Sequence, residues 1–96
     1  MTIPLRVLIL EDSEADAELV LYELCRAGYE PAWSRVDNET DYRDNLSPAL
    51  DVILADYSLP DFDALRALQI LKSQDRDIPF IIVTGAVGEE VVATAR

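Results

Sequence analysis

The chain has 96 residues, enough for one domain, and half of them are apolar, so it can form a hydrophobic core. Its 19 acidic and 8 basic residues give a formal charge of −11, which argues against binding to nucleic acid or to an anionic membrane surface. It contains no histidine. This excludes histidine-based catalytic triads, two-histidine zinc sites and imidazole bases.

The single cysteine, Cys25, excludes an internal disulfide and fits a reducing compartment. We expect its side chain to be a small, buried apolar group on a helix. The start of the chain has no basic segment of the kind found in signal peptides. No apolar run approaches the roughly 20 residues of a membrane span. The sequence therefore predicts a cytoplasmic protein.

Short apolar runs alternate with stretches of helical periodicity, which is typical of βαβ units around a parallel sheet. The first strand is predicted over residues 5–10, as a nearly continuous apolar run. A helix follows it. Ser13 is the expected N-cap of that helix, and Gly28 is expected to end it in a left-handed conformation. A weaker strand is predicted over residues 32–36, where Trp33 is interpreted as a packing residue.

Asn38 is expected to cap a short second helix that carries Tyr42. The remaining elements are strands at 51–55 and 80–83 and helices at 64–73 and 89–96, joined by loops at 57–63 and 85–88. Right-handed crossovers and the stronger apolar character of the first, third and fourth strands favour the order 2-1-3-4. The predicted fold is a doubly wound, flavodoxin-like α/β sheet formed by one domain over residues 1–96.

Acidic and hydroxyl side chains follow three of the predicted strands. Glu11 and Asp12 come after the first, Asp56 after the third and Thr84 after the fourth. Ligands of open α/β sheets bind at the carboxyl ends of the strands, so these four side chains are expected at one edge. Taken alone, Asp56 is also readable as a turn or capping residue, and Thr84 as a β-branched residue that closes a strand.

Three carboxylates in one pocket repel one another, and a bound Mg²⁺ would remove that conflict. A carboxylate in such a pocket can act as a nucleophile and form an aspartyl phosphate. The cation would then shield the phosphoryl charge, and the Thr84 hydroxyl would bond to one of its oxygens. The pattern predicts a magnesium site with phosphoryl-transfer chemistry.

Three segments together resemble a known family. They are VLILEDS at 7–13, DVILADYSLP at 51–60 and IPFIIVTG at 78–85. In order and spacing they are similar to the receiver domain of two-component response regulators, of the flavodoxin-like chemotaxis-regulator type, over essentially the whole chain. The sequences ADYSLP at 55–60 and GEE at 88–90 also resemble those of receivers attached to hybrid sensor kinases.

The resemblance implies a role for each candidate residue. Asp56 matches the phosphoacceptor of the family, and Thr84 matches the hydroxyl that bonds to the phosphoryl group. Mg²⁺ would be bound directly by Asp12, by Asp56 and by the backbone carbonyl of Ser58, and through water by Glu11. The implied partner is a sensor histidine kinase or a phosphotransfer protein. The domain would assist only its own phosphorylation and dephosphorylation, and would not be an enzyme in the usual sense.

The sequence departs from the family in two places. It has Asp63-Ala64 where the family usually has Asp-Gly, which is expected to change only the loop and the start of the next helix. It ends at Arg96, before the fifth strand, the fifth helix and the lysine of the family. We therefore expect a C-terminally truncated receiver whose exposed strand edge at 80–84 leads to self-association or domain swapping, unless the chain is a fragment.

Two alternatives remain open. One is a phosphorylation-independent module for dimerisation or docking, which the missing lysine favours. The other is a phosphatase of the haloacid dehalogenase type. That chemistry uses two aspartates spaced Asp-x-Asp after the first strand, and residues 11–14 lack this spacing. A glycine-rich phosphate loop is also absent from the sequence.

Overall fold

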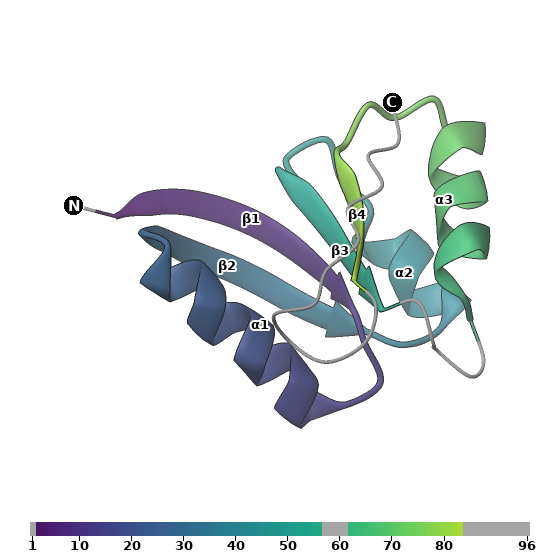
Figure 1. Ribbon diagram of the computed structural model, residues 1–96. Coiled ribbons are helices and arrows are strands. Elements are labelled where there is room, and N and C mark those ends of the chain that lie inside the picture. Colours follow the sequence, from purple (N-terminus) through teal and green to yellow (C-terminus); the bar gives the residue numbers. More distant parts are fainter. Residues whose placement is uncertain (1, 57–61, 84–96) are drawn as a thin grey trace.

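The computed structural model describes residues 2–56 and 62–83. The elements follow in the order β1 (Ile3–Leu10), α1 (Glu14–Arg26), β2 (Tyr29–Val36), α2 (Glu39–Asn45), β3 (Val52–Asp56), α3 (Ala64–Ser73) and β4 (Phe80–Val83) (Figure 1). The strands are parallel and lie in the order β2-β1-β3-β4, which confirms the predicted doubly wound sheet. The helix predicted at 89–96 lies outside the described residues.

The strand register brings the carboxyl ends of the strands to one edge of the sheet. Leu10 at the end of β1 pairs with Val36 of β2 on one side and with Ala55 of β3 on the other. Asp56 of β3 in turn pairs with Val83 of β4. At the other end of the sheet, β1 and β2 extend beyond β3, whose first register partner in β1 is Val7 (Figure 1). Segments that follow the strands therefore start from neighbouring positions.

The predicted helix caps are present. The hydroxyl of Ser13 accepts a 3.2 Å hydrogen bond from the backbone N–H of Asp16, and the side chain of Asn38 accepts one of 2.8 Å from that of Asp41. Gly28 follows the end of α1 with a φ of +98°, a conformation that few residues other than glycine adopt. The two caps explain where α1 and α2 begin, and the backbone conformation of Gly28 explains where α1 ends.

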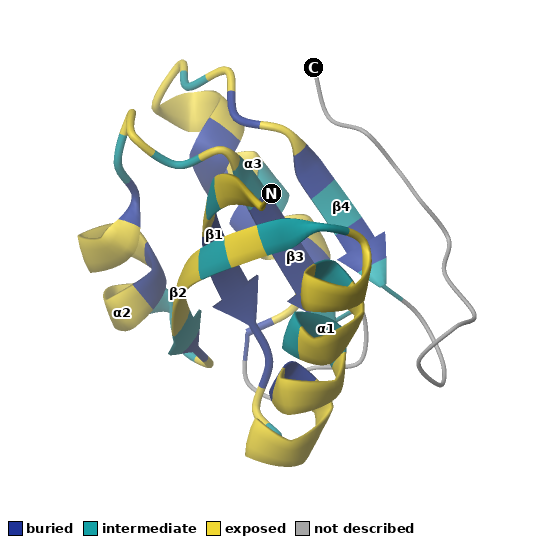
Figure 2. Ribbon diagram, turned by 90° about the vertical axis from the view of Figure 1, so that its left-hand side faces the viewer, coloured by how far each residue is buried: buried dark blue, intermediate teal, exposed yellow. Residues whose placement is uncertain are grey.

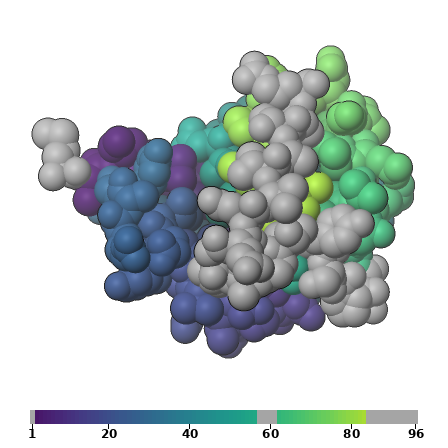
Figure 3. All heavy atoms as spheres, viewed as in Figure 1, coloured from purple at the N-terminus to yellow at the C-terminus, as the bar shows by residue number. Residues whose placement is uncertain are grey.

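The sheet has an apolar layer on each face. Val7 and Ile9 of β1 pack on the side of α1, whereas Leu8 and Leu10 point to the opposite side and pack with residues of α2 and α3. Buried residues lie in β1, β3 and β4 and on the inner face of α3, and exposed residues lie on the outer faces of the helices (Figure 2). The space-filling view shows the first part of the chain and α3 on opposite sides of the molecule (Figure 3).

Tyr42 joins α2 to α3 inside the larger of these two layers. Its side chain is fully buried, and its hydroxyl donates a 2.9 Å hydrogen bond to the backbone carbonyl of Ala67. Its ring lies 5.3 Å from the ring of Phe62, centroid to centroid, at an angle of 57°. Burial raises the pKa of the Tyr42 hydroxyl, so this group remains a hydrogen-bond donor at every physiological pH.

Three expectations about individual positions were wrong. Cys25 is exposed, because the buried stripe of α1 centres on Ala17 and Cys25 falls outside it. Trp33 is 49% exposed, since β2 pairs with β1 alone among the described strands and lies at the edge of their sheet. That strand also begins at Tyr29, three residues earlier than expected, because pairing with β1 extends it. Within residues 2–56 and 62–83, no helix combines the length and hydropathy needed to cross a membrane.

Candidate metal site

Three carboxylates meet at the carboxyl edge of the sheet. Glu11 and Asp12 directly follow β1, and Asp56 is the last residue of the neighbouring strand β3. One oxygen from each carboxylate lies within 4.8 Å of the others. Glu11 is buried, Asp56 is half-buried and Asp12 is exposed, so the cluster opens from the protein interior to the solvent. The structure thus brings together the three acidic residues that the sequence placed at this edge.

Glu11 is held in place from several directions. Its backbone N–H donates a 2.9 Å hydrogen bond to the carbonyl of Val36, and its Oε1 accepts one of 3.0 Å from the backbone N–H of Ser13. Burial raises the pKa of Glu11 to about 7, helped by a hydrogen bond with Asp12 and by the charge of Asp56 and opposed by the bond from Ser13. A positive charge beside these carboxylates would therefore stabilise the ionised form of Glu11 at neutral pH.

This arrangement fits a small, hard divalent cation. All three side chains offer carboxylate oxygens, which Mg²⁺ and Ca²⁺ prefer to nitrogen or sulfur. The raised pKa of Glu11 reflects burial and repulsion among the carboxylates, and both effects favour binding of positive charge. The exposed position of Asp12 leaves room for the water ligands that Mg²⁺ retains.

Comparison with known proteins gives related chains over most of the sequence. The chemotaxis protein CheY of Treponema pallidum is 29% identical over 94 residues, covering 96% of this chain and 65% of CheY. The phosphate regulon transcriptional regulatory protein PhoB of Klebsiella pneumoniae is 33% identical over 87 residues, covering 88% of this chain and 37% of PhoB. The chemotaxis protein CheY1 of Helicobacter pylori is 26% identical, covering 95% of this chain and 76% of CheY1. No family model matches the chain.

A solved structure shares the fold. Full-length FixJ from B. japonicum superposes with a TM-score of 0.66 at 23% identity, over 84% of this chain and 39% of FixJ. The chain is a receiver domain. It has the four-stranded, flavodoxin-like sheet of the receiver fold, and its relatives include transcriptional regulatory and chemotaxis proteins. It spans less than two thirds of the length of CheY and of PhoB.

Two of the predicted site residues of this receiver domain, Ser58 and Thr84, lie outside the described residues. Val83, which precedes Thr84 in the sequence, is the register partner of Asp56. The strand that leads to Thr84 therefore ends beside the last residue of β3.

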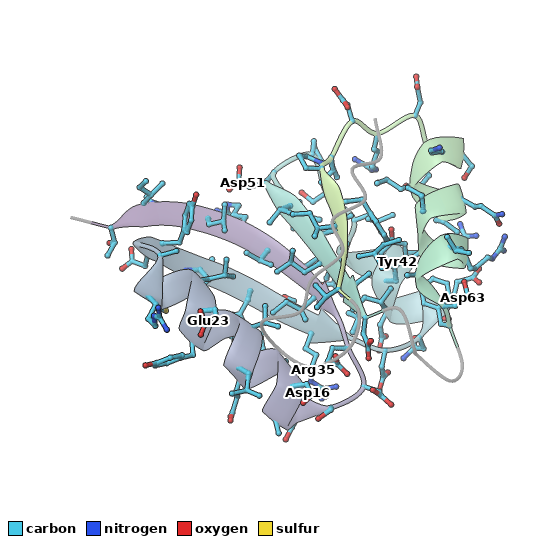
Figure 4. The ribbon with its side chains drawn as sticks, in the orientation of Figure 1. Asp16, Glu23, Arg35, Tyr42, Asp51 and Asp63 are labelled. Carbon is cyan, nitrogen blue, oxygen red and sulfur yellow. The ribbon has the colours of Figure 1, made fainter. Side chains whose placement is uncertain are left out.

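The structure shows that one further residue of the receiver domain, which the sequence did not suggest, contacts the backbone of Glu11. Arg35 of β2 donates a 3.1 Å hydrogen bond from Nη1 to the backbone carbonyl of Glu11. Its Nη2 lies 3.5 Å from Oε1 of Glu14 in the first turn of α1. Figure 4 shows Arg35 beside the N-terminal end of α1. The sequence signal for Arg35 is weak, because the predicted second strand did not show which of its residues reach the end of β1.

Proposed function

We propose that this receiver domain accepts a phosphoryl group on the carboxylate of Asp56, with Mg²⁺ bound at the acidic cluster. The main support is the convergence of Glu11, Asp12 and Asp56 at the carboxyl ends of two adjacent strands. The relatives add to this support, because one is named as a chemotaxis protein and another as a transcriptional regulatory protein. The proposed donor is a sensor histidine kinase or a phosphotransfer protein.

Asp56 is the best nucleophile of the three acids. A carboxylate must be ionised to attack phosphorus, and the pKa of Glu11 is raised to about 7. Asp12 is an exposed residue between β1 and α1, whereas Asp56 belongs to β3, which lies between β1 and β4. A rigid strand holds an attacking oxygen in place better than a turn does.

The other residues assist the transfer. Asp12, Asp56 and the backbone carbonyl of Ser58 would bind Mg²⁺ directly, and Glu11 would bind it through water. When bound, Mg²⁺ neutralises negative charge on the incoming phosphoryl oxygens. A carboxylate oxygen of Asp56 forms the new bond to phosphorus while the bond from phosphorus to the donor breaks. The donor keeps that bonding electron pair, and the Thr84 hydroxyl donates a hydrogen bond to a phosphoryl oxygen.

The edge of β4 supports a second part of the proposal, which concerns association. Among the described strands, β4 pairs with β3 alone, and its sequence FIIV is entirely apolar. An apolar strand with a free edge pairs readily with another strand. Two copies of the chain would therefore associate through the 80–84 edge. Light scattering tests this, and a monomer at micromolar concentration refutes it.

Phosphorylation is tested with a small acyl phosphate and Mg²⁺, followed by mass spectrometry of the intact chain and of its peptides. We expect one phosphoryl group on Asp56, none after chelation of Mg²⁺ and none on Asp56→Asn. Asp75→Asn is the matched control, since Asp75 is an exposed aspartate after α3 and outside the cluster. It should be modified like the wild type. A folded wild type that binds no millimolar Mg²⁺ and takes up no phosphate favours the docking module instead.

A further inference from the structure

We infer that Arg35 is a positioning residue for the cation site, because it fixes the backbone that carries Glu11 and Asp12. This inference rests on the proposed function. Arg35 lies on β2, and β2 contributes none of the three clustered carboxylates. Its guanidinium nevertheless reaches the end of β1 and the start of α1, through Glu11 and Glu14. It therefore links three elements at the point where the site is formed.

Two consecutive residues of β2 hold the backbone of Glu11 on both sides. The carbonyl of Val36 accepts the hydrogen bond from the Glu11 N–H at 2.9 Å, and Arg35 donates to the Glu11 carbonyl at 3.1 Å. That carbonyl belongs to the peptide group that joins Glu11 to Asp12. Fixing its orientation limits the directions that the Asp12 side chain can take. A metal site gains affinity when its ligands are already oriented before the ion arrives.

The contacts require the geometry of arginine. One terminal nitrogen bonds the carbonyl while the other lies near Glu14, and a guanidinium presents these two nitrogens in a fixed plane. A lysine has a single terminal nitrogen and cannot reproduce both contacts with the same spacing. The side chain of Arg35 is 26% exposed against 83% for that of Glu14, so the arginine is the better-ordered partner.

Because Arg35 is positively charged, a positioning role and a purely electrostatic role predict different changes in Mg²⁺ affinity when the side chain is removed. A positive charge near the site repels a metal cation, so if charge were its only effect, its removal would strengthen Mg²⁺ binding. Within the described part of the chain, Arg35 forms an ion pair with Glu14 and none with Glu11 or Asp12. If it acts by orienting the peptide after Glu11, its removal weakens Mg²⁺ binding. The two effects have opposite signs.

The test measures metal affinity in the full chain by titration with Mn²⁺, followed by electron paramagnetic resonance, with Mg²⁺ as competitor. We expect Arg35→Ala to lower the affinity by about 10-fold or more, as for other groups that orient metal ligands. Arg35→Lys should lie between the wild type and Arg35→Ala. Arg26→Ala is the matched control, because it removes the same charge from an exposed ion pair with Glu23 at the far end of α1. It should leave the affinity unchanged.

Circular dichroism and urea unfolding in chelator show whether each variant is folded. Where Arg35→Ala does not fold, Arg35→Lys decides, and an affinity equal to or above that of the wild type overturns the inference. The same result for a folded Arg35→Ala also overturns it. If the wild type itself binds neither Mn²⁺ nor Mg²⁺ at millimolar concentration, the proposed function fails. A wild type that binds, together with an Arg35→Ala variant that binds equally well, rejects only the role of Arg35.

Discussion

The backbone N–H of Glu11 donates to the carbonyl oxygen of Val36, 2.9 Å away, one step beyond the last register pair of β1 and β2. This bond continues the β1–β2 ladder past the apolar part of β1. Glu11 consequently lies inside the edge of the sheet, where the residue as a whole is only 8% exposed. A carboxyl group in that position favours the protonated form unless positive charge compensates it.

The first prediction concerns pH and metal-free stability. The folded pKa of Glu11 is about 7, and its ordinary value is 4.5. Between these values the folded state holds a proton that the unfolded chain has released, so protonation of Glu11 stabilises the fold at low pH. This contribution is lost as the pH rises through 7. We expect the free energy of unfolding in chelator to fall between pH 5 and pH 8, by on the order of 1–3 kcal/mol.

Urea unfolding of Glu11→Gln isolates this effect. The amide does not ionise, so the variant should be more stable than the wild type at pH 8 and should lose less stability between pH 5 and 8. Glu18→Gln, at an exposed position of α1, is the control and should follow the wild type. The lowered pKa of Glu39 acts in the opposite direction, but below pH 4.5. A flat stability profile for wild type in this window contradicts the prediction.

The second prediction concerns the metal. A ligand that binds only the folded state stabilises it, by about 2.7 kcal/mol at 100 times its dissociation constant. Mg²⁺ should therefore raise the urea midpoint of the wild type, and more so at pH 8 than at pH 5, where Glu11 is protonated. Asp12→Asn should abolish most of this gain. Asp75→Asn should retain it, because Asp75 is an exposed residue after α3 and lies outside the cluster.

The metal predictions concern a site whose acidic residues could largely be predicted from the sequence, for a simple reason. In a parallel sheet, polar residues that directly follow buried strands must meet at the carboxyl edge once the strand order is known. β1 and β3 are strongly apolar and easily recognised, so Glu11, Asp12 and Asp56 can be placed together from the sequence alone. The helix caps Ser13 and Asn38 were predictable because capping is a local effect.

What the sequence did not predict depends on non-local contacts. β2 is an edge strand with a mixed pattern, so its start and the exposure of Trp33 are set by pairing with β1. For the same reason the sequence did not indicate Arg35, because its role depends on its register position opposite Ile9 of β1. The bond from Tyr42 to Ala67 spans 25 residues and follows from how α2 and α3 pack, which no local pattern encodes.

Tyr42 provides the third prediction. Tyr42→Phe removes its hydroxyl and leaves the ring against Phe62, so it should cost only the hydrogen bond, about 1 kcal/mol. Tyr42→Ala also removes the ring from the core and should cost about 3–5 kcal/mol. Tyr22→Phe is the control, because Tyr22 is 60% exposed and should change the free energy of unfolding by less than about 0.5 kcal/mol. Equal effects of the two Tyr→Phe changes would refute the role of the buried bond.

The fourth prediction concerns the end of α3. Asp75 has a φ of +55°, in the left-handed region where a residue with a Cβ is strained. Its N–H donates to the carbonyl of Lys72 at 3.0 Å, and the N–H of Arg76 donates to that of Leu71 at 3.4 Å. This pair of bonds is the Schellman arrangement, whose left-handed position is usually occupied by glycine.

Asp75→Gly should therefore stabilise the domain, by about 0.5–1 kcal/mol, since the gain from relieved strain exceeds the added freedom of the unfolded chain. Asp77→Gly removes the same charge two residues later, at a position without a positive φ, and should give no gain or a small loss. Urea unfolding of both variants at one pH makes the comparison. If the two substitutions changed the free energy of unfolding equally, loss of negative charge would explain the result, and the conformation of Asp75 would not.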